Sequence, residues 1–176
     1  MDDLHELAQL IKQRNAVASE IAALIERPAQ IGHVGEYVAS RIFHIELQES
    51  ASQKGMDGHF LEGPLVGRSV NIKWYAKQES MLAINPEALP DFYLVLAGPK
   101  TAAMSSRGQT RPWIVSSVHL FDAQELVDVL RERGIIFSVA TSVRQHLWDE
   151  AELYPNQRTH FLQLTDDQRQ LLALFQ

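Results

Sequence analysis

The run Phe92-Tyr93-Leu94-Val95-Leu96-Ala97 decides the fold, because its consecutive apolar residues leave no polar side to turn towards water. A run of this length and composition, bounded by Pro90 and by Gly98-Pro99, is typical of a strand that is buried on both faces. Such a strand lies in the centre of a sheet with helices packed against it. The rest of the sequence therefore has to supply neighbouring strands and amphipathic helices.

Upstream of this run, residues 56–61 and 67–76 alternate between apolar and polar side chains and are separated by a turn-rich segment. Both segments are predicted to be strands. Residues two apart share one face of a strand, so Asn71 and Lys73 point to the same side and Trp74 points to the other. If the two strands pair as a hairpin, Asp57 lies opposite Asn71 or Lys73.

Two helices precede the strands. Leucine, isoleucine and valine recur every three or four residues over 3–27, which predicts one long helix. This helix either packs on its own domain or serves as a dimerisation arm, and the sequence leaves both open. A second helix is predicted over 34–44. In it Glu36 lies off the apolar stripe, beside Gly35 and Ala39, whose small size allows close packing.

Downstream, a strand is predicted over 113–120 and a helix over 122–133, where Asp122 and Glu125 have the spacing of a capping box. The apolar run 135–140 is predicted to be a further strand. Two more capping spacings start the helices that follow, the first of which should end at Pro155. They are Ser142 with Gln145, and Thr165 with Gln168.

The predicted fold class is α/β, with a mixed central sheet flanked by helices and an extra long helix at the N-terminus. The absence of linkers and repeats predicts one domain over 1–176. We divide it into an N-terminal helical arm, a core, and a C-terminal helix-strand-helix extension. Their bounds are 1–30, 31–140 and 141–176.

Composition narrows the class of protein. The 176 residues are 45% hydrophobic and include no cysteine, which excludes disulfides and thiolate metal sites. The chain starts with acidic residues, unlike a signal peptide, and no apolar run approaches the roughly 20 residues of a membrane helix. We therefore expect a cytoplasmic protein without a membrane partner.

Charge is unevenly distributed along the chain. The net charge of −6 argues against a protein that coats nucleic acid without specificity. Residues 54–112, however, carry seven Lys or Arg against five Asp or Glu, while both flanking segments are acidic. A mildly basic centre between acidic flanks suits a focused cleft for an anionic ligand.

The basic segment, together with the helix before it, holds residues that suit metal-dependent cleavage of phosphodiesters. That reaction needs carboxylates to hold Mg²⁺ and a cation near the attacking water and the phosphate. Glu36 and Asp57 supply carboxylates, and Lys73 supplies the cation. The sequence therefore predicts one site made by these side chains.

Three short segments resemble the active-site half of the PD-(D/E)xK (restriction-endonuclease-like) nuclease superfamily. They are Gly35-Glu36, Gly55-Met56-Asp57-Gly58 and Val70-Asn71-Ile72-Lys73. The core of that superfamily is a helix, three strands, a helix and a strand. The predicted elements repeat this order: helix 34–44, strands 56–61, 67–76 and 92–97, helix 122–133 and strand 135–140.

Within the superfamily, the chain resembles an uncharacterised prokaryotic domain family. Members of that family carry a Gly-Glu helix, a Ser-x-Lys-Gly-x-Asp-Gly turn and an Ile-Lys strand. The corresponding segments here are residues 35–36, 52–58 and 72–73. The resemblance covers most of the chain.

The resemblance implies an endonuclease-like protein that hydrolyses DNA with Mg²⁺ or Mn²⁺, as part of a restriction or defence system. It makes Glu36 the helix carboxylate, Asp57 the central metal ligand, and Lys73 the residue that orients or activates water. The second acidic position of the pattern falls on Asn71, whose amide oxygen can bind Mg²⁺ but adds no charge. A displaced carboxylate is left open among Glu46, Glu49 and Glu62.

The alternative is a nuclease fold that has lost catalysis and acts as a nucleic-acid-binding or assembly module, with Asn71 in the place of the missing acid. Whether the chain is an enzyme is therefore left open. In either case further side chains near the site are candidates for phosphate contact. They are Lys54, His59, Arg68, Tyr75 and Lys77.

Overall fold

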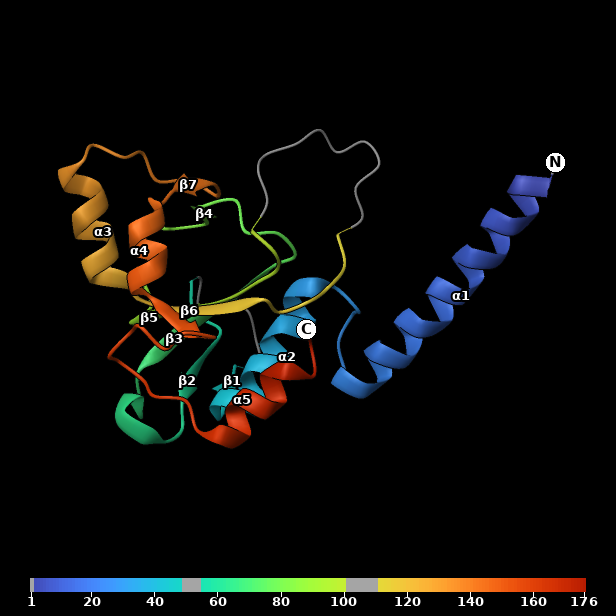
Figure 1. Cartoon of the computed structure of the whole chain (residues 1–176), viewed down its shortest axis with the longest axis horizontal. Coiled ribbons are helices and arrows are strands. Elements are labelled where there is room, and N and C mark those ends of the chain that lie inside the picture. Colours follow the sequence, from blue (N-terminus) through green and yellow to red (C-terminus); the bar gives the residue numbers. More distant parts are fainter. Residues whose placement is uncertain (1, 49–54, 101–110) are drawn as a thin grey trace.

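The structure is a computed structural model that describes residues 2–48, 55–100 and 111–176. A six-stranded mixed sheet forms its body, in the order β1-β2-β3-β5-β6-β8 (Figure 1). β3 and β5 are parallel, and the other neighbouring strands are antiparallel. The predicted fold class is therefore confirmed. The strands are β1 (Ile45–Leu47), β2 (Gly58–Phe60), β3 (Ser69–Tyr75), β5 (Phe92–Ala97), β6 (Ser117–Asp122) and β8 (Glu152–Tyr154).

Helices cover both faces of the sheet. α2 and α5 lie together on one face, and α3 and α4 pack on the other (Figure 1). Two-residue strands, β4 and β7, pair outside the main sheet. None of the helices in the described ranges combines the length and apolar character needed to cross a bilayer. The remaining elements are α1 (Asp2–Ile25), α2 (Ile31–Phe43), the 3-10 helix η1 (Gly63–Leu65), β4 (Met81–Leu82), α3 (Ala123–Glu132), β7 (Thr141–Ser142), α4 (Gln145–Glu150) and α5 (Asp166–Ala173).

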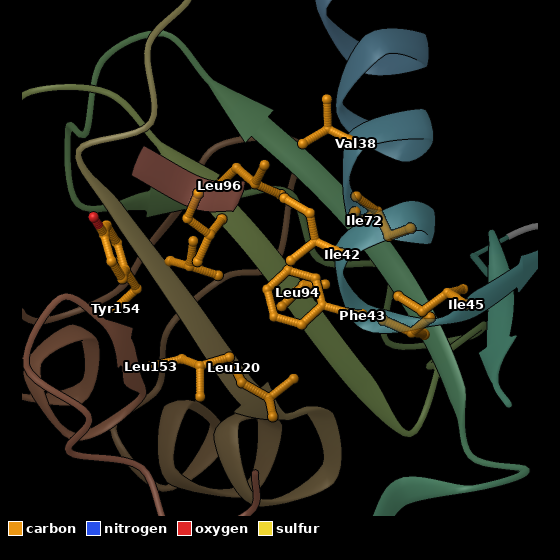
Figure 2. Packing of buried hydrophobic residues seen from close by; sticks show 14 of the residues in the cluster. Val38, Ile42, Phe43, Ile45, Ile72, Leu94, Leu96, Leu120, Leu153 and Tyr154 are labelled. Carbon is orange, nitrogen blue, oxygen red and sulfur yellow. The ribbon is translucent and has the colours of Figure 1, made fainter. Parts of the chain in front are cut away.

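Strand β5 is the centre of the core, as its composition predicts. Every residue of β5 is buried, between β3 on one side and β6 on the other. Leu94 and Leu96 belong to the apolar cluster on the α2 face, where Ile42 packs (Figure 2). Tyr93 and Val95 belong to the cluster on the opposite face. The alternation of side chains along one strand thus supplies both layers.

Helix α2 approaches β3 very closely at Gly35. A Cβ atom built on Gly35 would lie 2.9 Å from Cβ of Trp74, which is closer than van der Waals contact allows. One turn further on, Ala39 is fully buried. The close packing predicted from these two small residues is therefore confirmed.

The predicted strand 135–140 is wrong. This segment connects α3 to β7 without strand pairing, and Ile136 and Val139 are 87% and 89% exposed. The position beside β6 is taken instead by β8, which was predicted to be the end of a helix closed by Pro155. Local apolar runs carry no information about which of two segments reaches a sheet edge.

The capping patterns give a mixed result. Asp122 accepts a hydrogen bond from the Glu125 amide at 2.9 Å, and Thr165 forms a complete capping box with Gln168. The predicted cap at Ser142 is wrong, because Ser142 pairs with Met81 in β7 and α4 begins only after Arg144. Pairing with a distant strand has overridden the local capping preference.

Helix α1 extends away from the sheet, with the N-terminus at its far end (Figure 1). It contacts α2 near its own C-terminal end, where Ile25 is buried. The apolar side chains of its N-terminal half are exposed, including Leu7 and Leu10. The alternative in which this helix packs on its own domain is therefore wrong for that half.

The contact at Gly35 predicts a large penalty for a methyl group. Gly35→Ala should lower the free energy of unfolding by about 1–3 kcal/mol, because Cβ of Trp74 lies next to the backbone and cannot move aside. Gly32→Ala is the matched control in the same helix, since a Cβ there has no neighbour within 4 Å. It should be neutral or stabilise by up to about 1 kcal/mol. Urea unfolding compares the two, and equal effects would contradict the packing argument.

Candidate functional site

Asp57 lies where β2 stops pairing with β3. The last β2 residue in the ladder is Gly58, which pairs with Val70. Beyond it, the Asp57 amide donates to the Val70 carbonyl at 2.9 Å. The Asp57 carboxylate then accepts the Ile72 amide through Oδ2 at 2.6 Å. The carboxylate oxygen thus accepts the hydrogen bond that a backbone carbonyl would accept if the pairing of the two strands continued. This hydrogen bond holds the Asp57 side chain against the edge of β3.

The electrostatics of Asp57 show which charges surround it. Burial is the main influence and raises the pKa of Asp57 above its ordinary value, and the negative charge of Glu36 raises the pKa further. The Ile72 amide and the positive charges of Lys73 and Arg27 oppose this rise. Glu36 and Lys73 therefore each lie within electrostatic range of Asp57.

Glu36 is held by a cation that the sequence analysis missed. The Arg27 guanidinium donates from Nη1 to Oε2 of Glu36 in an ion pair. Arg27 stands in the connection between α1 and α2, nine residues before its partner. That spacing matches no helical pair pattern, so no sequence signal joins the two residues. The pair neutralises one of the two predicted carboxylates.

Asn71 presents an unsatisfied oxygen inside the protein. The residue is 6% exposed, and its Oδ1 has no hydrogen-bond partner among the described residues. A buried carbonyl oxygen without a partner costs free energy, so it favours a ligand that brings a donor or a cation. Asn71 and Lys73 line a cavity of about 230 Å³, whose other walls include Tyr93, Asn85 and Ser138. Burial raises the pKa of Tyr93 to about 12, so its hydroxyl is neutral.

The residues of the site lie on both faces of the sheet at the edge of β3. Asn71 and Lys73 share one face, as predicted, while Trp74 packs under Gly35 on the other. Glu36 therefore approaches Asp57 from the α2 face of the sheet and Lys73 approaches from the opposite face. The cavity itself is lined by Asn71 and Lys73 but not by either carboxylate.

Three of the predicted phosphate contacts have structural partners, and Arg68 and Tyr75 are the first two. Arg68 forms an ion pair with Asp91 at 2.9 Å, and Asp91 also accepts the Ser69 amide and hydroxyl at 2.7 and 2.8 Å. This network joins the starts of the parallel strands β3 and β5. Although burial raises the pKa of Asp91, these partners bring it below its ordinary value. The Tyr75 hydroxyl likewise accepts the Ala83 amide at 3.1 Å.

The other candidates are placed as follows. Lys77 is paired with Glu79 at 2.9 Å, and His59 lies on β2 between its register partners Glu46 and Ser69. Lys54 lies outside the described residues.

The structure also places two of the three carboxylates considered as replacements for an acid at position 71. Glu46 lies on β1, opposite His59. Glu62 lies past the far end of β2 from Asp57 and contacts His44 at 3.3 Å. Glu49 lies outside the described residues. Neither described carboxylate joins the lining of the cavity beside Asn71.

The donor set suits a hard cation. Two carboxylates and an amide oxygen are the ligand types that Mg²⁺ prefers, and the unpartnered Oδ1 of Asn71 fits such a role. Within the described ranges, no group of three or more His, Asp or Glu side chains is placed to hold a metal ion. A larger cavity, about 590 Å³, lies between α3 and α4 and contains none of the predicted site residues.

Comparisons with known proteins add no information about the function of this site. No protein-family model matches the sequence, and no curated protein is significantly similar to it.

The raised pKa of Asp57 predicts a pH-dependent effect of neutralising it. Because the folded state binds a proton more tightly at Asp57 than the unfolded chain does, this group makes the protein less stable as pH rises above 3.8. Asp57→Asn stays neutral and keeps an oxygen for the Ile72 amide. We therefore expect Asp57→Asn to be more stable than wild type at pH 7, with a difference that shrinks as pH falls towards 3.8 and is lost below that value.

Urea unfolding across this pH range measures the difference. Asp128→Asn, at an exposed position on α3, is the control for removing a carboxylate and should show no comparable trend. A variant Asp57→Asn that is less stable than wild type at pH 7 would contradict the argument.

Proposed function

We propose that this protein is a metal-dependent nuclease that hydrolyses DNA phosphodiester bonds. The observation that supports this most is the meeting of Asp57 with Glu36 and Lys73 at the edge of β3. Asn71, whose Oδ1 is buried without a hydrogen-bond partner among the described residues, lines the cavity together with Lys73 and offers a neutral oxygen ligand in the same region. The combination of like-charged carboxylates with one nearby lysine suits phosphodiester chemistry.

Asp57, Glu36 and Asn71 are the residues that would hold Mg²⁺ or Mn²⁺. When bound, the ion would polarise the phosphate and stabilise the negative charge that develops on it. Asp57 is pre-positioned for this by the Ile72 amide, which fixes Oδ2 and leaves Oδ1 without a hydrogen bond from the described residues. Burial is the main cause of the raised pKa of Asp57, and the negative charge of Glu36 adds to it, so a cation placed between the two carboxylates would be favoured.

Lys73 would orient the attacking water or accept its proton. Lys73 lines the cavity and forms no ion pair with the described acidic residues. Its positive charge acts to lower the pKa of Asp57. Arg27 has a different role. It is the counterion of Glu36 in the absence of a metal, and it would have to yield that carboxylate for Glu36 to become a ligand.

The partner that we propose for this site is DNA, in a restriction or defence system, as the resemblance to PD-(D/E)xK nucleases implies. A second copy of this chain, joined through α1, is the other proposed partner.

The second candidate function is a nucleic-acid-binding or assembly module without catalysis. Two observations favour it: Arg27 already neutralises Glu36, and Asn71 supplies no charge where a second acid would stand. Such a module would bind DNA with a strong dependence on salt but would be indifferent to Mg²⁺.

A titration with Mn²⁺, followed by calorimetry and paramagnetic broadening, tests the metal site without knowledge of the substrate. Wild type should bind one ion, and Asp57→Asn should lose that binding. Arg27→Ala should bind the ion more tightly than wild type, because Glu36 is then free of its competing cation. Equal behaviour of wild type and Asp57→Asn up to about 10 mM metal would favour the binding module, since a working site binds far more tightly.

Cleavage of plasmid or linear DNA in the presence of Mg²⁺ tests the reaction. Lys73→Ala should reduce the rate by about 10²–10⁴-fold, the range expected for a group that handles the proton of the attacking water. Its unfolding curve should stay close to that of wild type. Lys12→Ala, on the exposed surface of α1, is the control for loss of one lysine. Cleavage that survives in Lys73→Ala, or that needs no metal, would reject the proposed mechanism.

A further inference from the structure

Helix α1 carries an apolar stripe that the rest of the chain does not cover. The helix spans 24 residues, which makes it about 36 Å long. In its N-terminal half Leu4, Leu7, Leu10 and Ile11 are 67%, 51%, 54% and 47% exposed. Single exposed apolar residues are ordinary, but four on one face of a projecting helix form a surface that favours a partner.

The stripe has the spacing of a coiled coil. Alternating steps of four and three residues connect the positions along one seam of the helix. They are Asp3, Leu7, Leu10, Arg14, Val17, Ile21 and Leu24. Leu4 and Ile11 flank this seam on one side, while Gln9 and Ala16 lie on the opposite face of the helix.

The N-terminal half of the seam is the part that is available to a partner. Towards the C-terminal end, Ile21 is half-buried and Ile25, beside the seam, is buried where the helix meets the body of the protein, although Leu24 on the seam is 70% exposed. The helix up to Val17 is exposed and extends away from the body (Figure 1). A helix without tertiary packing is marginal in water, so this half gains stability from a second surface.

Charge on the seam determines the partner and its direction. Its two charged positions are Asp3 and Arg14, one of each sign. In a parallel pair of identical helices, Arg14 would face Arg14 and Asp3 would face Asp3. In an antiparallel pair centred between Ala8 and Gln9, Asp3 faces Arg14 of the second copy and Leu7 faces Leu10. Two copies of the seam therefore bring opposite charges together only when the two helices are antiparallel.

We propose that the chain forms a homodimer through an antiparallel pairing of the N-terminal halves of α1. Leu7 and Leu10 form its centre, Leu4 and Ile11 its flank, and Asp3 with Arg14 its two ends. The two bodies lie at opposite ends of the helix pair, so neither blocks the other. This inference is independent of the proposed nuclease activity, because mass and cross-linking are measured without metal or DNA.

Sedimentation equilibrium of the full chain tests the dimer. Wild type at about 100 μM should have twice the mass of the 19.9 kDa chain. Leu7→Glu combined with Leu10→Glu should sediment as a monomer. Gln9→Glu combined with Ala16→Glu adds the same charge to the opposite face and should remain dimeric. Circular dichroism shows whether each variant keeps the helix. A monomeric wild type, or a dimer that survives Leu7→Glu with Leu10→Glu, would overturn the proposal.

The orientation is tested with single cysteines, because the chain has none of its own. Asp3→Cys and Arg14→Cys proteins are oxidised separately and as an equimolar mixture. Antiparallel pairing predicts that the mixture forms a disulfide between the two variants far more readily than either protein cross-links with itself. Preferential cross-linking of Asp3→Cys with itself would show a parallel pair and reject the arrangement.

Discussion

Helix α2 lies so close to β3 at Gly35 that even a methyl group would meet Cβ of Trp74 at 2.9 Å. Both the core and the site depend on this approach. One and two turns along the helix from Gly35, Val38 and Ile42 reach the cluster around Leu94 and Leu96 (Figure 2). Next to Gly35, Glu36 comes within electrostatic range of Asp57. The packing that excludes water from one face of the sheet therefore also brings the two carboxylates together.

The site lies at the edge of β3, at the point where the regular pairing with β2 ends. β2 stops pairing at Gly58, and the Asp57 carboxylate takes over as acceptor for the Ile72 amide. This arrangement buries part of a carboxylate near another one, which raises the pKa of Asp57 and lowers the stability of the ionised protein. Arg27 and Lys73 compensate in part. A strained balance of charges of this kind is common at functional sites, although ion pairs that serve structure alone also produce it.

The sequence predicted the long elements better than the short ones. β5, α2 and α3 follow from apolar periodicity, because their patterns are sustained over many residues. The segment 135–140 is as apolar as a strand but pairs with no strand, and its Ile136 and Val139 are exposed, while the short strand β8 takes the position beside β6. Short segments form strands or connections according to which sheet edge they can reach. That depends on the whole chain and not on local composition.

The features of the candidate site also fall into those that the sequence predicted and those that only the tertiary structure showed. Alternation along β3 was enough to predict that Asn71 and Lys73 share a face, and hairpin pairing was enough to bring Asp57 beside them, because both depend on neighbouring residues. Only the tertiary structure showed the Arg27–Glu36 ion pair, the unsatisfied Asn71 oxygen, and the partners of Arg68 and Tyr75. These features depend on how distant segments meet in space, and the turn between α1 and α2 or the start of two parallel strands leaves no periodic pattern. The sequence by itself therefore determined the four middle strands of the sheet (β2, β3, β5 and β6), most of the helices that cover them and the residue types of the site. The tertiary structure decided which of those residues are paired and which are left to bind a ligand.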